Sequence, residues 1–214
     1  MVRKSIASPN VARSSRTRPR QVHQFLVVLA GTDPLVWRRI QVPDDYSFWD
    51  LHVAIQDAMG WLDSHLHRFI VSDPRTGREQ RLGIPDEEYP EEPPCQPDWE
   101  VPVSAYFEEE RPPALYVYDF GDDWHHVLMY EGTWPADPSK TYPTCLAGAR
   151  ACPREDCGGV PGFADFLAAL ADPKHPEHGE YLAWAGVGYD PEAFDPAVVR
   201  FDDPQVRRQK AFEE

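Results

Sequence analysis

The hydrophobic pattern begins with two short apolar runs, which are followed by one longer segment of periodically spaced apolar residues. The apolar run 25–30 and the alternating run 36–42 have the length of strands and are spaced like a hairpin. Ser47 follows as a helix N-cap, and apolar residues then recur at helical spacing over 48–59. Gly60 ends that helix as a C′ residue does. The pattern therefore predicts a strand hairpin with an amphipathic helix packed on it.

The residues after this helix predict one more strand, which is followed by a long loop. In the strand predicted at 65–71, His65, His67 and Phe69 share one face because side chains alternate along a strand. Residues 73–113 then turn acidic and contain eight prolines from Pro85 onward, which excludes a central strand there. We expect this acidic, Pro-rich segment to be a surface loop with short extended pieces.

The second half of the chain contains the strongest hairpin pattern. Residues 115–120 and 124–130 predict two strands joined by the turn residues Gly121, Asp122 and Asp123. Apolar spacing then predicts helices at 162–171, 178–186 and within 195–214, after a loop at 143–162. Strands and helices do not alternate, so we expect an α+β fold, with an antiparallel or mixed sheet of five to six strands and three to four helices.

Charge is distributed unevenly along the 214 residues. Residues 1–20 contain six basic residues and no acid, which leaves −21 for the rest of a chain whose net charge is −15. We expect a disordered basic tail at 1–20 and one domain at 21–214. The tail is also the one place where nucleic acid could bind, because the acidic body repels phosphates. With no apolar run long enough for a membrane span or a signal peptide, we expect a cytoplasmic protein without membrane contact.

Several motifs follow one another in a fixed order. They are Trp37-Arg38-Arg39-Ile40, Phe48 to His52 with Gln56, Gly60-Trp61, Ser64 to Phe69, Tyr118 to Trp124 with His126, Cys145 to Pro153, and Glu155 to Gly159. Through these motifs, residues 22–200 resemble the plasmid open-reading-frame-three-like family, first named from a root-inducing plasmid (pRi). The resemblance implies a compact α+β domain of bacterial, archaeal and mobile-element proteins.

The same resemblance implies little about activity. Some members are labelled passenger or resolvase-like proteins of insertion elements, but no catalytic residue set belongs to the family. This chain lacks the residue constellation of a serine or tyrosine recombinase, and its acidic body disfavours the basic groove that the latter needs. We therefore interpret the recombination label as genomic association.

Three cysteines lie close together in the loop at 143–162. Cys145, Cys152 and Cys157 could bind zinc, with His126, the recurring histidine of the family motif, as fourth ligand. Reduced structural thiols and a disulfide are the alternatives. Cys95, alone in the acidic segment, is expected to be a free surface thiol.

Aromatic, histidine and acidic residues of the motifs form a second candidate site. A groove that they line would suit a small ligand, a peptide or unpaired bases, or would hold a divalent metal, whereas core packing is the alternative use of the same residues. The candidate groove residues are Trp37, Arg39, His52, His65, His67, Asp119, Asp122 and Trp124.

The function that these observations favour is a non-catalytic binding or accessory domain linked to mobile genetic elements. Its partner would be a protein or a small ligand. A metal-assisted hydrolase or nuclease-like enzyme using the His/Asp groove is one alternative. Nucleic-acid contact through residues 1–20 is the other, and zinc is the one cofactor that the sequence suggests.

Overall fold

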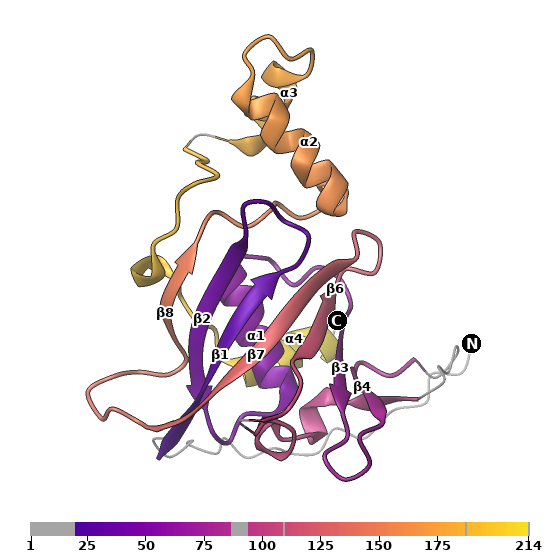
Figure 1. Ribbon diagram of the computed structural model, residues 1–214, viewed down its shortest axis with the longest axis vertical. Coiled ribbons are helices and arrows are strands. Elements are labelled where there is room, and N and C mark those ends of the chain that lie inside the picture. The colour runs from indigo at the N-terminus through magenta and orange to yellow at the C-terminus, as the bar shows by residue number, and fades with distance from the viewer. Residues whose placement is uncertain (1–19, 87–93, 109, 187, 214) are drawn as a thin grey trace.

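A single mixed sheet with helices on one face forms the body of the protein (Figure 1). The computed structural model describes residues 20–86, 94–108, 110–186 and 188–213. The strand order is β5-β4-β3-β6-β7-β1-β2-β8, and only β4 and β5 pair in parallel. The α+β class with a mixed sheet is confirmed, but the predicted number of five to six strands is wrong, because the sheet has eight.

The predicted hairpin and helix form where the pattern placed them. β1 (Gln21–Leu29) pairs with β2 (Val36–Pro43), and α1 (Phe48–Met59) follows. Ser47 and Asp50 close a reciprocal capping box, in which each side chain accepts from the other's backbone N–H. Gly60, at φ 88°, is the left-handed residue that ends α1. Local chemistry therefore fixes both ends of the helix.

The missing strands come from segments that the sequence marked as loops. The acidic segment contributes β4 (Glu79–Gly83) and β5 (Cys95–Pro97), with β5 at the sheet edge as its prolines require. Two short 3₁₀ helices, η1 (Asp98–Glu100) and η2 (Val103–Ala105), lie beyond β5. The cysteine loop contributes β8 (Thr144–Ala149), which pairs with β2 at the other edge.

The remaining elements differ from their predicted bounds by a few residues. β3 (His67–Ser72) begins at His67, so that His65 lies just before the strand. β6 (Ala114–Tyr118) and β7 (Trp124–Pro135) form the expected hairpin, and β7 continues to Pro135. The helices are α2 (Gly159–Ala171), α3 (His178–Ala185), the 3₁₀ turn η3 (Pro196–Val198) and α4 (Pro204–Glu213).

The core lies between α1 and the sheet. Phe25, Ile40 and Phe69 point from three strands toward α1, where Phe48 and Leu51 meet them. α4 packs against α1 on that same side, and α2 and α3 pack on each other beyond one end of the sheet (Figure 1). In the described part of the chain, no helix has both the length and the apolar character needed to cross a membrane.

Two predictions on the chain's organisation are not settled by this arrangement. Residues 1–19 lie outside the described residues, so the disordered basic tail stays a prediction. The single domain at 21–214 stays a prediction as well.

Candidate functional site

Three loops meet beside the end of α1 and form the candidate site. Glu155, in the loop before α2, accepts through Oε1 from the Leu62 backbone N–H at 2.9 Å and from the Tyr118 hydroxyl at 2.6 Å. Asp122, in the β6–β7 turn, accepts through Oδ2 from the Gly158 N–H at 3.1 Å. Burial, followed by the hydrogen bond to Glu155, raises the pKa of Tyr118, so that its hydroxyl stays a donor. These contacts hold all three loops in one position.

A histidine and two carboxylates, one group from each loop, point toward one another at this junction. His65 Nε2 lies 3.2 Å from Asp156 Oδ1 and 3.6 Å from Asp119 Oδ2. The ligand atoms of all three lie within 4.8 Å of one another. Despite this proximity, His65 Nε2 has no hydrogen-bond partner among the described residues. The three groups thus face a common point and are not satisfied by each other.

Backbone turns orient the two carboxylates. Asp119, at φ 56°, accepts through Oδ1 from the N–H groups of Gly121 at 2.9 Å and Asp122 at 3.3 Å. This turn uses one carboxylate oxygen and leaves Oδ2 facing His65. Asp156, at φ 59°, lies between two anchored residues and is 76% exposed, whereas the Asp119 side chain is 10% exposed. The site is therefore walled on one side and open to water on the other.

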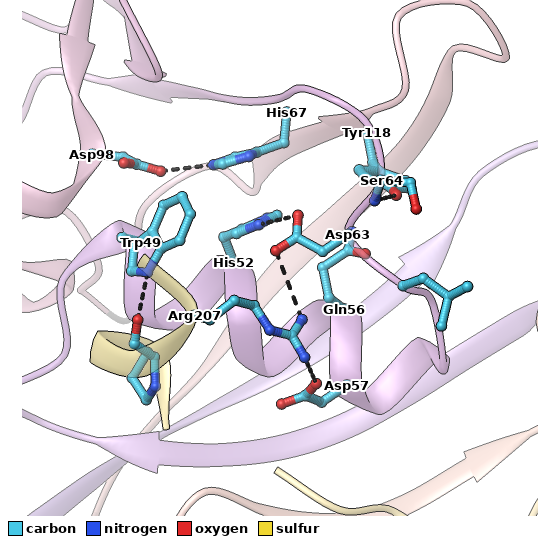
Figure 2. A network of polar contacts seen from close by, with 12 residues as sticks. Trp49, His52, Gln56, Asp57, Asp63, Ser64, His67, Asp98, Tyr118 and Arg207 are labelled. Atoms are coloured by element: carbon cyan, nitrogen blue, oxygen red, sulfur yellow. Dashed lines mark hydrogen bonds and ion pairs between the residues drawn. The ribbon is translucent and has the colours of Figure 1, made fainter. Parts of the chain in front are cut away.

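A second cluster of histidines and acids lies buried next to this site (Figure 2). The rings of His52 and His67 stack with centroids 3.5 Å apart and planes 8° from parallel. His52 Nε2 lies 2.8 Å from Asp63, and His67 Nε2 lies 2.7 Å from Asp98. Imidazole lone pairs lie in the ring plane, so two stacked rings cannot both point at one ion. This cluster therefore suits a structural network better than a metal site.

The protonation state of this network follows from its burial. Burial, and then the neighbouring His67, lower the pKa of His52 to about 4, so the ring is neutral at pH 7. Its Nε2–H then donates to Asp63, and its Nδ1 accepts from the Tyr116 hydroxyl at 2.8 Å. That hydroxyl accepts in turn from Gln56 Nε2 at 2.8 Å. A directed chain of hydrogen bonds thus joins α1, β6 and the loop after α1.

The C-terminal helix docks on the same network (Figure 2). Arg207 of α4 lies 2.7 Å from Asp57 and 3.7 Å from Asp63. Trp49 Nε1 donates at 2.9 Å to the carbonyl oxygen of the first residue of α4. Positions 144 and more residues apart in the sequence are joined in this way.

The structure separates the eight predicted groove residues. His65, Asp119 and Asp122 lie at the three-loop junction, and His52 and His67 lie in the buried network. Trp124 packs in the core, with its ring centroid 6.0 Å from that of Trp61. Trp37 and Arg39 point to the opposite face of the sheet, where Arg39 pairs with Glu131 at 2.8 Å. Only part of the predicted groove is therefore brought together.

Two of the four predicted zinc ligands, Cys145 and Cys152, lie near the buried Arg38. Arg38 donates to the carbonyl oxygens of Ala58 and Ala149, and its pKa is lowered by burial while the nearby Cys145 and Cys152 act in the opposite direction. His126 Nδ1 faces the carbonyl oxygen of Tyr116 at 3.3 Å, and burial lowers its pKa to about 3.

Burial also raises the pKa of the Cys157 thiol to about 12, and it raises the pKa of the Cys152 thiol as well. Within the described ranges, no group of three ligand atoms spaced for one metal ion includes a cysteine. Zinc binding by the cysteines stays a prediction. Cys95 forms no disulfide within the described part of the chain, and it is half-buried where a surface position was expected.

Several residues of these clusters had not been predicted, among them Asp156, Asp63 and Arg207. Asp156 lies inside the Glu155–Gly159 motif, and Asp63 lies between the Gly60-Trp61 and Ser64 motifs, so motif position alone was an available signal. Arg207 has no such signal, because its partners lie in α1 and in the loop that follows it.

Comparisons with known proteins agree on one family. The family described as plasmid pRiA4b ORF-3-like protein matches residues 21–198. An uncharacterized protein, y4hQ, from Sinorhizobium fredii is 38% identical over 180 residues, which cover 84% of this chain and 87% of that protein. The crystal structure of a protein of unknown function, MM3350, from Methanosarcina mazei Go1 has a TM-score of 0.79 and 40% identity, covering 86% of this chain and 99% of the other.

Proposed function

We propose that this chain, which belongs to the plasmid pRiA4b ORF-3-like protein family, is a binding domain that holds a divalent metal ion. The ligands would be His65 Nε2, Asp119 Oδ2 and Asp156 Oδ1. The descriptions of the matched proteins name no activity or ligand, so the support comes from the geometry of the junction. The observation that carries the proposal is the imidazole nitrogen that faces two carboxylates without a hydrogen-bond partner among the described residues.

The spacing of the three atoms supports metal coordination. Ligands about 2.1 Å from one ion lie roughly 3.0–3.4 Å from each other in octahedral or tetrahedral geometry. The nitrogen–oxygen distances of 3.2 and 3.6 Å lie at or slightly beyond that range. His65 and Asp156 already have this spacing, and His65 and Asp119 would need to approach by only a few tenths of an ångström.

The donor set also restricts the kind of ion. One imidazole nitrogen with two carboxylate oxygens suits Zn²⁺ or Mn²⁺ better than Ca²⁺ or Mg²⁺, which prefer oxygen alone. The negative charges of the Asp119 and Asp156 carboxylates balance the two positive charges of the ion. Because all three ligands approach from the protein side, the remaining coordination positions face water.

Those open positions favour a second candidate function, metal-assisted hydrolysis. A divalent ion with three protein ligands lowers the pKa of a bound water and makes it a nucleophile. The 76% exposure of the Asp156 side chain leaves room for a substrate on that side. Turnover of an activated phosphodiester with added Mn²⁺, lost in a His65→Ala variant, is the result that this function requires.

Isothermal titration with Mn²⁺ tests the primary proposal. Mn²⁺ is chosen because thiolates bind it weakly, which separates this site from the predicted zinc site at the cysteines. We expect binding by the full chain and at least about a tenfold weaker affinity in His65→Ala and Asp119→Asn, since each loses one of three ligands.

The matched control is His125→Ala. His125 also pairs with an aspartate, Asp123, at 2.9 Å, but it lies outside the three-ligand group. Its variant should bind Mn²⁺ like the parent chain. No binding by the parent chain, or equal losses in His65→Ala and His125→Ala, would contradict the proposal.

Contact with nucleic acid through residues 1–20, in an accessory role linked to mobile DNA, is a separate proposal. It is supported by the six basic residues of that segment beside an acidic body. DNA affinity measured at two salt concentrations, with and without residues 1–20, tests it. Equal affinities, or no salt dependence, would contradict it.

A further inference from the structure

The face of the sheet turned away from α1 carries an apolar row that belongs to neither of the two clusters described above. The helices α1 and α4 lie behind the sheet in Figure 1, and none of the helices in the described residues covers its front. On five neighbouring strands, directly paired residues share this front face because cross-strand partners point to the same side. Along the order β3-β6-β7-β1-β2, the row reads Ile70, Leu115, Val127, Val28 and Trp37.

The row continues to both edges of the sheet. Beyond Trp37 it reaches Ala149 of β8, and beyond Ile70 it reaches Arg81 of β4 and Cys95 of β5. A second, shorter apolar pair, Leu26 with Met129, lies beside it. The five apolar side chains of the row and the two of the second pair are all half-buried. They differ in this from the residues on the α1 side of the sheet, which are fully buried. We call these outward-facing positions the open face.

The extent of the open face matches that of a protein interface. Eight strands spaced about 4.8 Å apart span about 34 Å, and three rows of side chains cover roughly 20 Å along the strands. The product is roughly 700 Å², close to the about 800 Å² that each partner contributes to a standard interface. Within this area, the apolar row and the Leu26–Met129 pair form a contiguous apolar centre, and contiguous apolar surface is typical of association sites.

Charge indicates which partner can approach. The chain carries a net −15, yet the charged outward positions of these strands are three arginines and two glutamates: Arg39, Arg68, Arg81, Glu79 and Glu131. Two of the arginines already pair with the two glutamates. The open face is therefore a nearly neutral area on an acidic molecule, and two copies can meet there without the repulsion that other surfaces would impose.

We propose that the open face binds a second copy of this chain, with the two sheets packed face to face in a symmetric dimer. A two-fold axis near the middle of the row brings Val127 and Leu115 of one copy against the same residues of the other, because an isologous contact repeats each residue on both sides. The apolar row then becomes the interior of a sheet-on-sheet interface with the usual layer spacing of about 10 Å. The site formed by His65, Asp119 and Asp156 lies off this face and stays accessible.

Sedimentation equilibrium of the full chain over a wide concentration range tests this dimer. We expect the parent chain to form dimers, and Val127→Glu to raise the dimer dissociation constant at least about 100-fold, since it places two unpaired carboxylates in a dry interface. Leu182→Glu, at a 54% exposed position on α3, is the control and should remain dimeric. A parent chain that is monomeric throughout, or a folded Val127→Glu variant that still dimerises, overturns the proposal.

A second measurement does not depend on any variant. Hydroxyl-radical footprinting of the parent chain at low and high concentration reports the exposure of individual side chains. We expect Met129 and Trp37 to become protected as concentration rises, while Trp184, which is 39% exposed on α3, keeps its reactivity. Protection that is absent from Met129 and Trp37, or that spares them and falls on Trp184, overturns the open face as the interface.

Discussion

Removing one hydroxyl group, that of Tyr116, should destabilise the whole domain. This hydroxyl donates to His52 Nδ1 and accepts from Gln56 Nε2, both at 2.8 Å, and all three side chains are fully buried. Tyr116→Phe leaves the ring in place, so its packing against Phe69, with centroids 4.8 Å apart, is kept. The change therefore isolates the two hydrogen bonds.

The magnitude follows from the two groups left without a partner. A buried polar group that loses its hydrogen bond costs about 1–3 kcal/mol, and the variant leaves two such groups, His52 Nδ1 and Gln56 Nε2. Losses above about 4–5 kcal/mol are exceptional for a single substitution, so we expect the free energy of unfolding to fall by about 3 kcal/mol.

Urea denaturation at pH 7, followed by circular dichroism, measures this loss. Tyr142→Phe is the matched control, since the Tyr142 hydroxyl accepts from the Asp137 N–H at 3.1 Å in a solvent-accessible contact. That control should change stability by less than about 0.5 kcal/mol. A loss below about 1 kcal/mol in Tyr116→Phe would refute the reasoning, because it would mean that the two partners are satisfied in another way.

Three further changes test other parts of the fold. Arg38→Gln, which removes a buried guanidinium that lies 3.7 Å from the Phe194 ring, should cost about 2–4 kcal/mol in urea denaturation, whereas a cost below about 1 kcal/mol would contradict its role. Because the folded-state pKa of His52 is about 4 against an ordinary 6.5, the unfolded chain binds the extra proton first. The unfolding free energy should therefore fall between pH 6.5 and pH 4, with about 3 kcal/mol of that fall due to His52, and the fall should be smaller by about that amount in His52→Gln. Gly159→Ala should lower the melting temperature, since at φ 68° its Cβ would lie 2.4 Å from the Asp122 carbonyl oxygen; an unchanged temperature would contradict that clash.

The sequence predicted two of the three ligands of the proposed metal site, His65 and Asp119, but not Asp156. The sequence grouped His65 with His67 and His52 because alternation along a strand places them together. In the structure β3 begins at His67, so His65 turns outward to Asp119 and Asp156, while the other two histidines stack under α1. β3 begins two residues later than the sequence predicts, and this difference leaves His65, rather than His67, available to a metal ion.

The sequence by itself determined the elements whose causes are local. The capping box at Ser47, the left-handed Gly60 and the hairpin turn before Trp124 each depend on residues within a few positions, so periodicity and turn chemistry located α1 and two hairpins. Backbone sterics and nearby hydrogen bonds act on the chain before any distant contact forms.

Only the tertiary structure decided the edges of the sheet and the assembly of the site. β8 pairs with β2 more than 100 residues away, and Gly148 is needed there because a Cβ would lie 2.3 Å from the Phe194 ring. Asp156 likewise meets His65 only because Glu155 and Gly158 anchor their loop to other elements. Contacts of this kind depend on segments that are distant in the sequence and already folded. They therefore produce no periodic pattern in the local sequence from which they could be predicted.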